Sequence, residues 1–178
     1  MQTAELAILD WIGAHLRCGV LDAVMPWVSR LCDHGEVWIV LCLVLLAIPR
    51  TRRTGAALAF ALAVDLLACN LLIKPLVGRV RPFAVRAVPL LVPPPADASF
   101  PSGHTAVSFA AAAALRRSKS RLWLPALALA AVLALSRLYL YVHWPSDVLG
   151  GAVVGTAAGL AGGRLADLVL RRRGGGEK

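Results

Sequence analysis

The sequence is poor in charged and in aromatic residues. Of its 178 residues, 16% are charged and 6% are aromatic, whereas 58% are hydrophobic and the mean hydropathy is +0.71. An average soluble domain is about 45–50% apolar and about 25% charged. This balance excludes a disordered chain, a collagen-like repeat and a typical cytosolic enzyme, and it predicts a single membrane-embedded domain over residues 1–178.

Cysteine is scarce and lacks a metal-binding pattern. The four cysteines contain no Cys-x-x-Cys pair, which favours small buried residues over disulfides or a zinc site. The first long apolar run is preceded by Glu5 and Asp10 and not by a basic segment, so no cleaved signal peptide is predicted. The cysteines are Cys18, Cys32, Cys42 and Cys69.

Acidic residues are outnumbered by basic ones, 10 to 19, which gives a net charge of +9. The basic residues form short clusters between apolar runs, as cytoplasmic loops of membrane proteins do. This distribution argues against a nucleic-acid partner. The clusters are Arg50, Arg52 and Arg53; Arg116, Arg117, Lys119 and Arg121; and Arg171, Arg172 and Arg173.

Apolar stretches predict an all-α, polytopic transmembrane bundle with about five spans, each needing roughly 20 apolar residues. Residues 1–32 are amphipathic and predict one or two helices at the outer interface; a sixth, tilted span there is the alternative. If the basic clusters are cytoplasmic, the segments 74–101 and 143–146 face outward. The five stretches are 35–49, 55–73, 102–115, 122–142 and 147–170.

Small and polar residues inside these stretches predict how the helices pack. The fifth stretch carries a glycine at every fourth position, which favours close packing inside the bundle over a dimer contact. Asp65 and Asn70 interrupt the second stretch and predict interhelical hydrogen bonds. The glycines are Gly151, Gly155, Gly159 and Gly163.

Two polar groups flank the second and third stretches on the predicted outer side. Lys74 and Arg81 lie seven residues apart and would share a face of any helix between them. Ser102 is a natural N-cap, and Gly103 lets a ligand approach the backbone. Free amides at such a helix start bind anions, and His104 could exchange a proton with a bound anion.

The third polar group lies where the fourth stretch meets the fifth. Asp147 follows His143 by four residues and could orient its ring, as in an activated histidine nucleophile or base. Arg137 adds a fork of donors suited to phosphate oxygens. Together the three groups are typical of phosphoryl transfer, in which positioning and charge neutralisation dominate. Because Asp147 is the only carboxylate among them, the sequence predicts chemistry without a metal or another cofactor.

At these residues the sequence resembles the type 2 phosphatidic acid phosphatase superfamily, the lipid phosphate phosphatases, in its bacterial integral membrane branch. The three signatures of that family fall in order within residues 74–147. They read Lys74-x6-Arg81-Pro82, Pro101-Ser102-Gly103-His104, and Ser136-Arg137-x5-His143-x3-Asp147.

The resemblance implies a role for each residue of the signatures. It implies that His143 attacks phosphorus to form a phosphohistidine, that Asp147 orients His143, and that His104 protonates the leaving oxygen and then activates water. It implies a helical bundle, with six spans in many bacterial members. The implied phosphate ligands are Lys74, Arg81, Ser102, Gly103 and Arg137.

These observations predict a cell-membrane lipid phosphatase whose partners are the bilayer and a lipid phosphate or diphosphate, with its site outside the cytoplasm. Undecaprenyl diphosphate is favoured, with phosphatidylglycerol phosphate and phosphatidic acid as further candidates. Arg79, outside the signatures, is expected to contact a charged headgroup. The alternatives are a lipid-phosphate binding or transport protein and a vanadium haloperoxidase, although the hydropathy argues against the latter.

Overall fold

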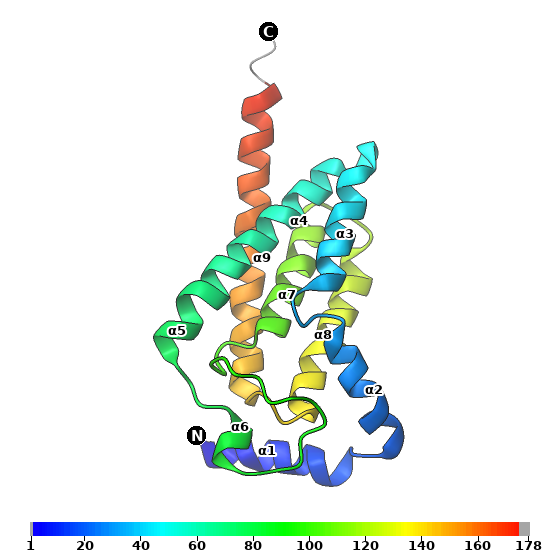
Figure 1. Cartoon of the computed structure of the whole chain (residues 1–178). Coiled ribbons are helices and arrows are strands. Elements are labelled where there is room, and N and C mark those ends of the chain that lie inside the picture. Colours follow the sequence, from blue (N-terminus) through cyan, green and yellow to red (C-terminus); the bar gives the residue numbers. More distant parts are fainter. Residues whose placement is uncertain (1, 175–178) are drawn as a thin grey trace.

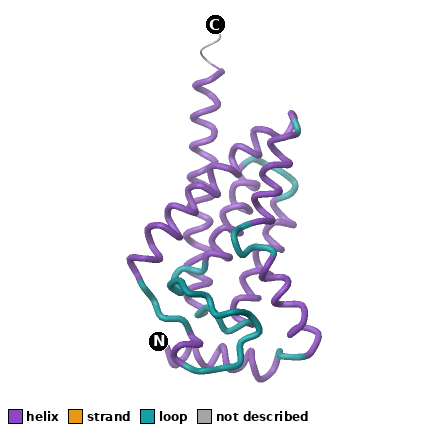
Figure 2. The backbone as a smooth tube through the Cα atoms, in the orientation of Figure 1, coloured by secondary structure: helices purple, strands orange, loops and turns teal. Residues whose placement is uncertain are grey.

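The computed structural model describes residues 2–174, which form helices and connecting loops with no strand among them (Figure 2). The all-α prediction is therefore confirmed. Two irregular helical segments continue longer helices: the 3-10 turn η1 at Pro49–Thr51 and the π-helical η2 at Leu66–Ile73. The α-helices are α1 (Gln2–His15), α2 (Gly19–Arg30), α3 (Glu36–Ala47), α4 (Arg52–Asp65), α5 (Lys74–Val77), α6 (Pro82–Val85), α7 (Gly103–Arg117), α8 (Trp123–Tyr139) and α9 (Pro145–Gly174).

Helices occupy all five stretches that the sequence assigned to spans. The segments Pro49–Val85 and Pro145–Arg171 are long and apolar enough to cross a membrane, whereas α3 and α8 are apolar but shorter. The number of spans therefore stays a prediction. Residues 1–32 contain two helices, α1 and α2, and Figure 1 shows α1 lying crosswise at one end of the bundle.

The basic clusters and α1 mark opposite ends of the molecule. Figure 1 shows the α3–α4 turn, the α7–α8 turn and the C-terminal part of α9 at the end away from α1. The loop that joins α6 to α7 crosses the α1 end instead. This arrangement agrees with the predicted alternation of the helices, although it does not identify the cytoplasmic side.

The glycines of α9 bring that helix directly against α7. A Cβ atom at Gly155 would lie 1.9 Å from the carbonyl oxygen of Ala106, and one at Gly159 would lie 2.4 Å from that of Ala110. Only glycine allows such an approach of the two backbones. The interpretation of this stripe as packing inside the bundle is confirmed, and the contact fixes the start of α7 beside the start of α9.

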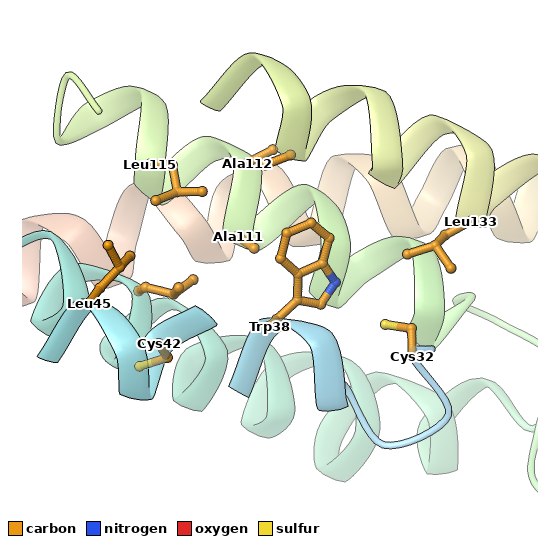
Figure 3. Packing of buried hydrophobic residues seen from close by; sticks show 10 residues of the cluster. Cys32, Trp38, Cys42, Leu45, Ala111, Ala112, Leu115 and Leu133 are labelled. Atoms are coloured by element: carbon orange, nitrogen blue, oxygen red, sulfur yellow. The ribbon is translucent and has the colours of Figure 1, made fainter. Parts of the chain in front are cut away.

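A larger hydrophobic cluster joins α3, α7 and α8 (Figure 3). Trp38 of α3 packs into it, and its indole Nε1 donates a hydrogen bond of 2.9 Å to Ser108 Oγ of α7. Three cysteines are buried as predicted, but Cys18 between α1 and α2 is exposed. Its loop position places it outside the hydrophobic core.

Candidate active site

A cavity of about 690 Å³ lies among α3, the α4–η2 segment, α7 and the C-terminal end of α8. It gathers six of the eight site residues named from the sequence. The other two, Ser102 and Asp147, are buried behind its wall. The six that line the cavity are Lys74, Arg81, Gly103, His104, Arg137 and His143.

Lys74 and Arg81 do not meet on one helix face, contrary to the argument from their spacing. The helix that carries Lys74 ends at Val77, and Gly78 adopts a left-handed φ of 56°, so the chain turns away before Arg81. The two cations converge through a carboxylate. Arg81 Nη2 donates to Asp97 Oδ1 at 2.6 Å, and Lys74 Nζ donates to Asp97 Oδ2.

Asp97 is a residue of the site that the sequence motifs did not indicate. Although partial burial acts in the opposite direction, its contacts with Lys74 and Arg81 lower the pKa of Asp97 to about 2. Its backbone carbonyl also accepts a bond of 2.9 Å from Arg81 Nε. The one sequence signal was an acid in the proline-rich loop between two signatures. The carboxylate of Asp97 therefore lies between the two cations and neutralises part of their charge.

His143 lies at the wall of the cavity between a cation and a carboxylate. Its Nε2 is 3.2 Å from Arg81 Nη1, and its Nδ1 is 3.4 Å from Asp147 Oδ2. The geometry at Nδ1 leaves that atom without a hydrogen-bond partner among the described residues. Burial lowers the pKa of His143 to about 3, helped by the charges of Arg137 and Arg81 and opposed by Asp147. The ring is therefore neutral at physiological pH.

Asp147 is held on both carboxylate oxygens. Its Oδ2 accepts from the backbone N–H of Trp144 at 2.9 Å and from Ser99 Oγ, and its Oδ1 accepts from Arg79 Nη1 at 2.6 Å. Arg79 is therefore paired with Asp147 and does not line the cavity, so the structure does not support its expected contact with a charged headgroup. A charged residue next to a signature does not reveal from its spacing which side of the chain it faces.

The N-terminal helix α1 supplies the partner that completes this network. Arg79 Nη2 donates to Glu5 Oε2 at 2.7 Å, while the backbone N–H and the hydroxyl of Ser146 donate to Glu5 Oε1 at 2.9 and 2.6 Å. Burial opposes the effect, but these contacts lower the pKa of Glu5. A chain of hydrogen bonds thus runs from α1 through Arg79 to Asp147, beside His143.

His104 faces a loop that the sequence analysis did not consider. Its Nε2 lies 3.1 Å from Asp33 Oδ1, in the connection between α2 and α3, and 3.4 Å from Arg137 Nη1. The same Arg137 nitrogen donates to Ser29 Oγ of α2. Residues 1–32 therefore help to build the site, a role that their amphipathic pattern could not indicate.

The start of α7 supplies backbone rather than a capping side chain. Ser102 occupies the N-cap position, but its side chain makes no capping bond. Its hydroxyl accepts from Thr105 Oγ1 at 3.0 Å, and its N–H donates to the carbonyl of Asp147 at 3.0 Å. A Cβ atom at Gly103 would lie 3.6 Å from Lys74 Nζ, so glycine keeps this corner of the cavity open.

Carboxylates are more numerous here than the sequence indicated. Asp33, Asp65 and Asp97 all line the cavity, in addition to Asp147 behind it. The premise that only Asp147 belongs to the site is therefore wrong, since the loops and α4 bring in three more acids. Chemistry without a metal stays a prediction, to be tested with a chelator.

Comparison with known proteins identifies the family. The PAP2 superfamily matches residues 54–167. The chain is 40% identical to decaprenylphosphoryl-5-phosphoribose phosphatase of Mycobacterium tuberculosis over 164 residues, covering 87% of this chain and 86% of that protein. It is 35% identical to undecaprenyl-diphosphatase of Sulfolobus acidocaldarius over 138 residues, covering 76% of this chain and 66% of that protein.

Solved structures share the arrangement of helices. Aquifex aeolicus LpxE superimposes with a TM-score of 0.76 at 25% identity, covering 88% of this chain and 93% of that one. A phosphatidylglycerolphosphate phosphatase of Bacillus subtilis gives the same TM-score at 24% identity and so supports the fold alone, over 94% of this chain and 87% of that one. The cavity of cations and histidines, the match over residues 54–167 and these relatives together show that the chain belongs to the PAP2 superfamily of phosphate-ester hydrolases.

Proposed function

We propose that this protein is an integral membrane phosphatase that removes the terminal phosphate of a polyprenyl lipid, with undecaprenyl diphosphate as the first candidate. The observation that carries the proposal is the convergence of Lys74, Arg81, Arg137 and two histidines on one cavity. Two of the relatives are named undecaprenyl-diphosphatase and decaprenylphosphoryl-5-phosphoribose phosphatase, and the substrates in both names are polyprenyl lipids.

The proposed reaction begins when the terminal phosphate replaces Asp97 between Lys74 and Arg81. Neutral His143 attacks phosphorus through Nε2, a P–N bond forms, and the bond from phosphorus to the leaving oxygen breaks. His104 gives that oxygen a proton. Arg137 and the amide of Gly103 neutralise the charge on the equatorial oxygens, in the manner of enzymes that act through charge stabilisation.

The second half of the reaction returns the enzyme to its starting state. His104 takes a proton from a water molecule, the water oxygen attacks phosphorus, and the P–N bond breaks to release inorganic phosphate. Asp147 positions the ring of His143 and stabilises its positive charge in the phosphorylated state. Each step balances without a metal ion or an oxidant.

The proposed setting is the plasma membrane, with the cavity on the extracytoplasmic side. The support is the position of the basic clusters at the end of the bundle away from α1, because positive loops stay in the cytoplasm. A lipid headgroup could then enter the cavity while its chain stays in the bilayer.

The test measures phosphate release by the purified protein in detergent containing EDTA. The substrates are undecaprenyl diphosphate, the decaprenyl phosphoribose phosphate, phosphatidylglycerol phosphate and phosphatidic acid. We expect release from a polyprenyl substrate, a fall of at least about a thousandfold in His143→Ala, since the nucleophile is lost, and an acid-labile phosphoprotein in the wild type. His15→Ala, which changes a histidine on α1 outside the cavity, is the matched control.

Two results would contradict the proposal. Wild-type turnover in His143→Ala would exclude His143 as the nucleophile. Absence of release from every lipid, together with binding of orthovanadate, would instead identify a lipid-phosphate binding protein.

A further inference from the structure

Asp65 is a buried carboxyl group that the proposed reaction does not use. It is the last residue of α4, its side chain is 1% exposed, and its Oδ1 has no hydrogen-bond partner among the described residues. The interhelical hydrogen bond expected from the sequence is therefore absent at that atom. Buried polar atoms without a partner are rare and costly. Since Asp65 lines the cavity, a ligand there could supply the partner.

The lining of the cavity combines the cations and His143 with apolar side chains, among them Ile39, Leu62 and Leu66. Ile39 of α3 and Leu66 of η2 are 46% and 53% exposed, so the apolar part of the lining reaches the surface. Figure 1 shows α4 and its continuation diverging from α3 toward α5. A lipid with its phosphate at His143 could place its hydrocarbon chain against these apolar residues.

The π-helical segment directs Asp65 and Lys74 into the same cavity. These residues are nine positions apart, which on an α-helix places them about 180° apart, on opposite faces. The wider turns of Leu66–Ile73 change this relation, and both side chains line the cavity. Asn70, within the same segment, lines it as well. Asp65 and Asn70 therefore line the same cavity as Lys74, which binds the phosphate in the proposed reaction.

The charges around Asp65 determine which kind of ligand group can bind beside it. Asp97 is paired with Lys74 and Arg81, and Asp33 is paired with His104. Asp65 has no ion pair of this kind among the described residues. A phosphate oxygen can only accept, and so it can bind Asp65 only when the carboxyl group is protonated. A hydroxyl group both donates and accepts, and so it can bind a carboxyl group in either protonation state and also the amide of Asn70.

We propose that Asp65 and Asn70 form a hydroxyl-binding subsite, which selects lipids whose terminal phosphate is carried by a hydroxylated unit such as glycerol or a pentose. The proposal rests on the proposed function, because it uses a phosphate bound at His143. It adds a substrate class to that function: lipids with a hydroxyl beside the terminal phosphate use the subsite, whereas undecaprenyl diphosphate, which has no hydroxyl at this position, does not.

The test compares Asp65→Asn, Asp65→Ala and Asp65→Leu in detergent. For each variant, kcat/KM is measured with the decaprenyl phosphoribose phosphate, with phosphatidylglycerol phosphate and with undecaprenyl diphosphate. The first two distinguish a pentose from a glycerol source of the hydroxyl. We expect Asp65→Ala and Asp65→Leu to lower the ratio of a hydroxylated substrate to the diphosphate at least about fivefold, mainly through KM, because a site built around a hydroxyl loses its discrimination. Asp65→Asn keeps a hydrogen-bonding group and should retain most of the ratio.

The controls separate this proposal from the one on which it rests. Leu67→Ala changes an exposed residue that does not line the cavity and should leave the ratio unchanged. Thermal unfolding of each variant detects loss of the fold, and the use of a ratio within one preparation removes differences in the folded fraction. An unchanged ratio, or a ratio that rises, overturns the subsite. Loss of all release in His143→Ala leaves the phosphatase proposal standing in either case.

Discussion

At the scale of single residues, the histidine proposed as nucleophile depends on a carboxylate that depends in turn on Arg79. Arg79 Nη1 donates a hydrogen bond of 2.6 Å to Asp147 Oδ1, and Arg79 Nη2 donates one of 2.7 Å to Glu5 Oε2. Charge-assisted bonds of this kind fix the orientation of their partners. Glu5 is therefore a positioning residue that acts through Arg79.

We expect Glu5→Gln to lower kcat while changing KM little, because the phosphate ligands stay in place. Loss of one charge-assisted bond costs about 1.5–3 kcal/mol, and transmission of part of that cost predicts about a tenfold fall in kcat. Glu5→Asp should recover part of it. Glu36 at the start of α3, which pairs with His34 outside this network, provides the control Glu36→Gln. An equal fall in both glutamine variants would contradict the role of Glu5.

Asp97 is expected to compete with phosphate for Lys74 and Arg81. In Asp97→Asn the cations lose their internal anion, so we expect orthovanadate to inhibit at a concentration several-fold lower than in the wild type. The apparent affinity for vanadate falls as the internal carboxylate occupies the site for a larger fraction of the time. Asp167→Asn, which removes a carboxylate paired with Arg117 outside the cavity, is the matched control. Weaker inhibition of Asp97→Asn would show that Asp97 holds the cations in place instead.

The neutral state of His143 predicts how stability depends on pH. Its folded pKa of about 3 lies below the usual value of about 6.5, so the unfolded chain binds this proton first as the pH falls. The stabilising contribution is complete above about pH 6.5 and is lost between that pH and about pH 3. We expect His143→Ala to show a smaller fall in thermal stability than the wild type between pH 7 and pH 4. Equal falls would contradict a neutral, buried His143.

At the scale of elements, the contact of α9 with α7 holds two signature segments together. Asp147 lies in the first turn of α9, Gly103 is the first residue of α7, and the backbone N–H of Ser102 donates to the carbonyl of Asp147 at 3.0 Å. The approach at Gly155 leaves no room for a Cβ atom. The spacing of the candidate site residues across these two helices therefore depends on a residue without a side chain.

We expect Gly155→Ala to destabilise the protein by about 1–3 kcal/mol or more, the usual cost of overpacking. Gly13→Ala in α1 meets no atom within 4 Å. That control should stabilise the helix by about 0.5–1 kcal/mol. Thermal unfolding in detergent distinguishes the two. A neutral Gly155→Ala would mean that the helices can separate without loss of stability.

The helices and the signature residues could be predicted from the sequence because their signals are local. Apolar stretches marked five helical segments, and three ordered motifs marked the residues that gather at the cavity. The features that could not be predicted depend mainly on contacts between residues far apart in the sequence. Glu5 meets Ser146, Asp33 meets His104, and the π-helical turn before Lys74 has no pattern that distinguishes it from an ordinary helix. Arg79 shows the same limit, since its partners depend on how distant elements pack.

At the scale of the whole molecule, the cavity is lined by residues from the starts of α3 and α7 and the end of α8, and these helix ends point away from the basic turns. This polarity predicts the accessibility of two exposed positions, Ala96 and Lys119. In a Cys18→Ser background, Ala96→Cys should react with an impermeant thiol reagent added to intact cells. Lys119→Cys should react only after lysis. The reverse pattern would place the cavity on the cytoplasmic side.

The contact between α1 and the start of α9 also sets the order in which the protein can be assembled. Glu5 leaves the ribosome 141 residues before Ser146, to which it binds. The loop that this contact closes is therefore long, and long loops cost more entropy to close than short ones. The hydrogen bonds of Glu5 beside Asp147 can form only after the start of α9 has been synthesised, so this part of the site is completed after α1, α7 and α8 have been made.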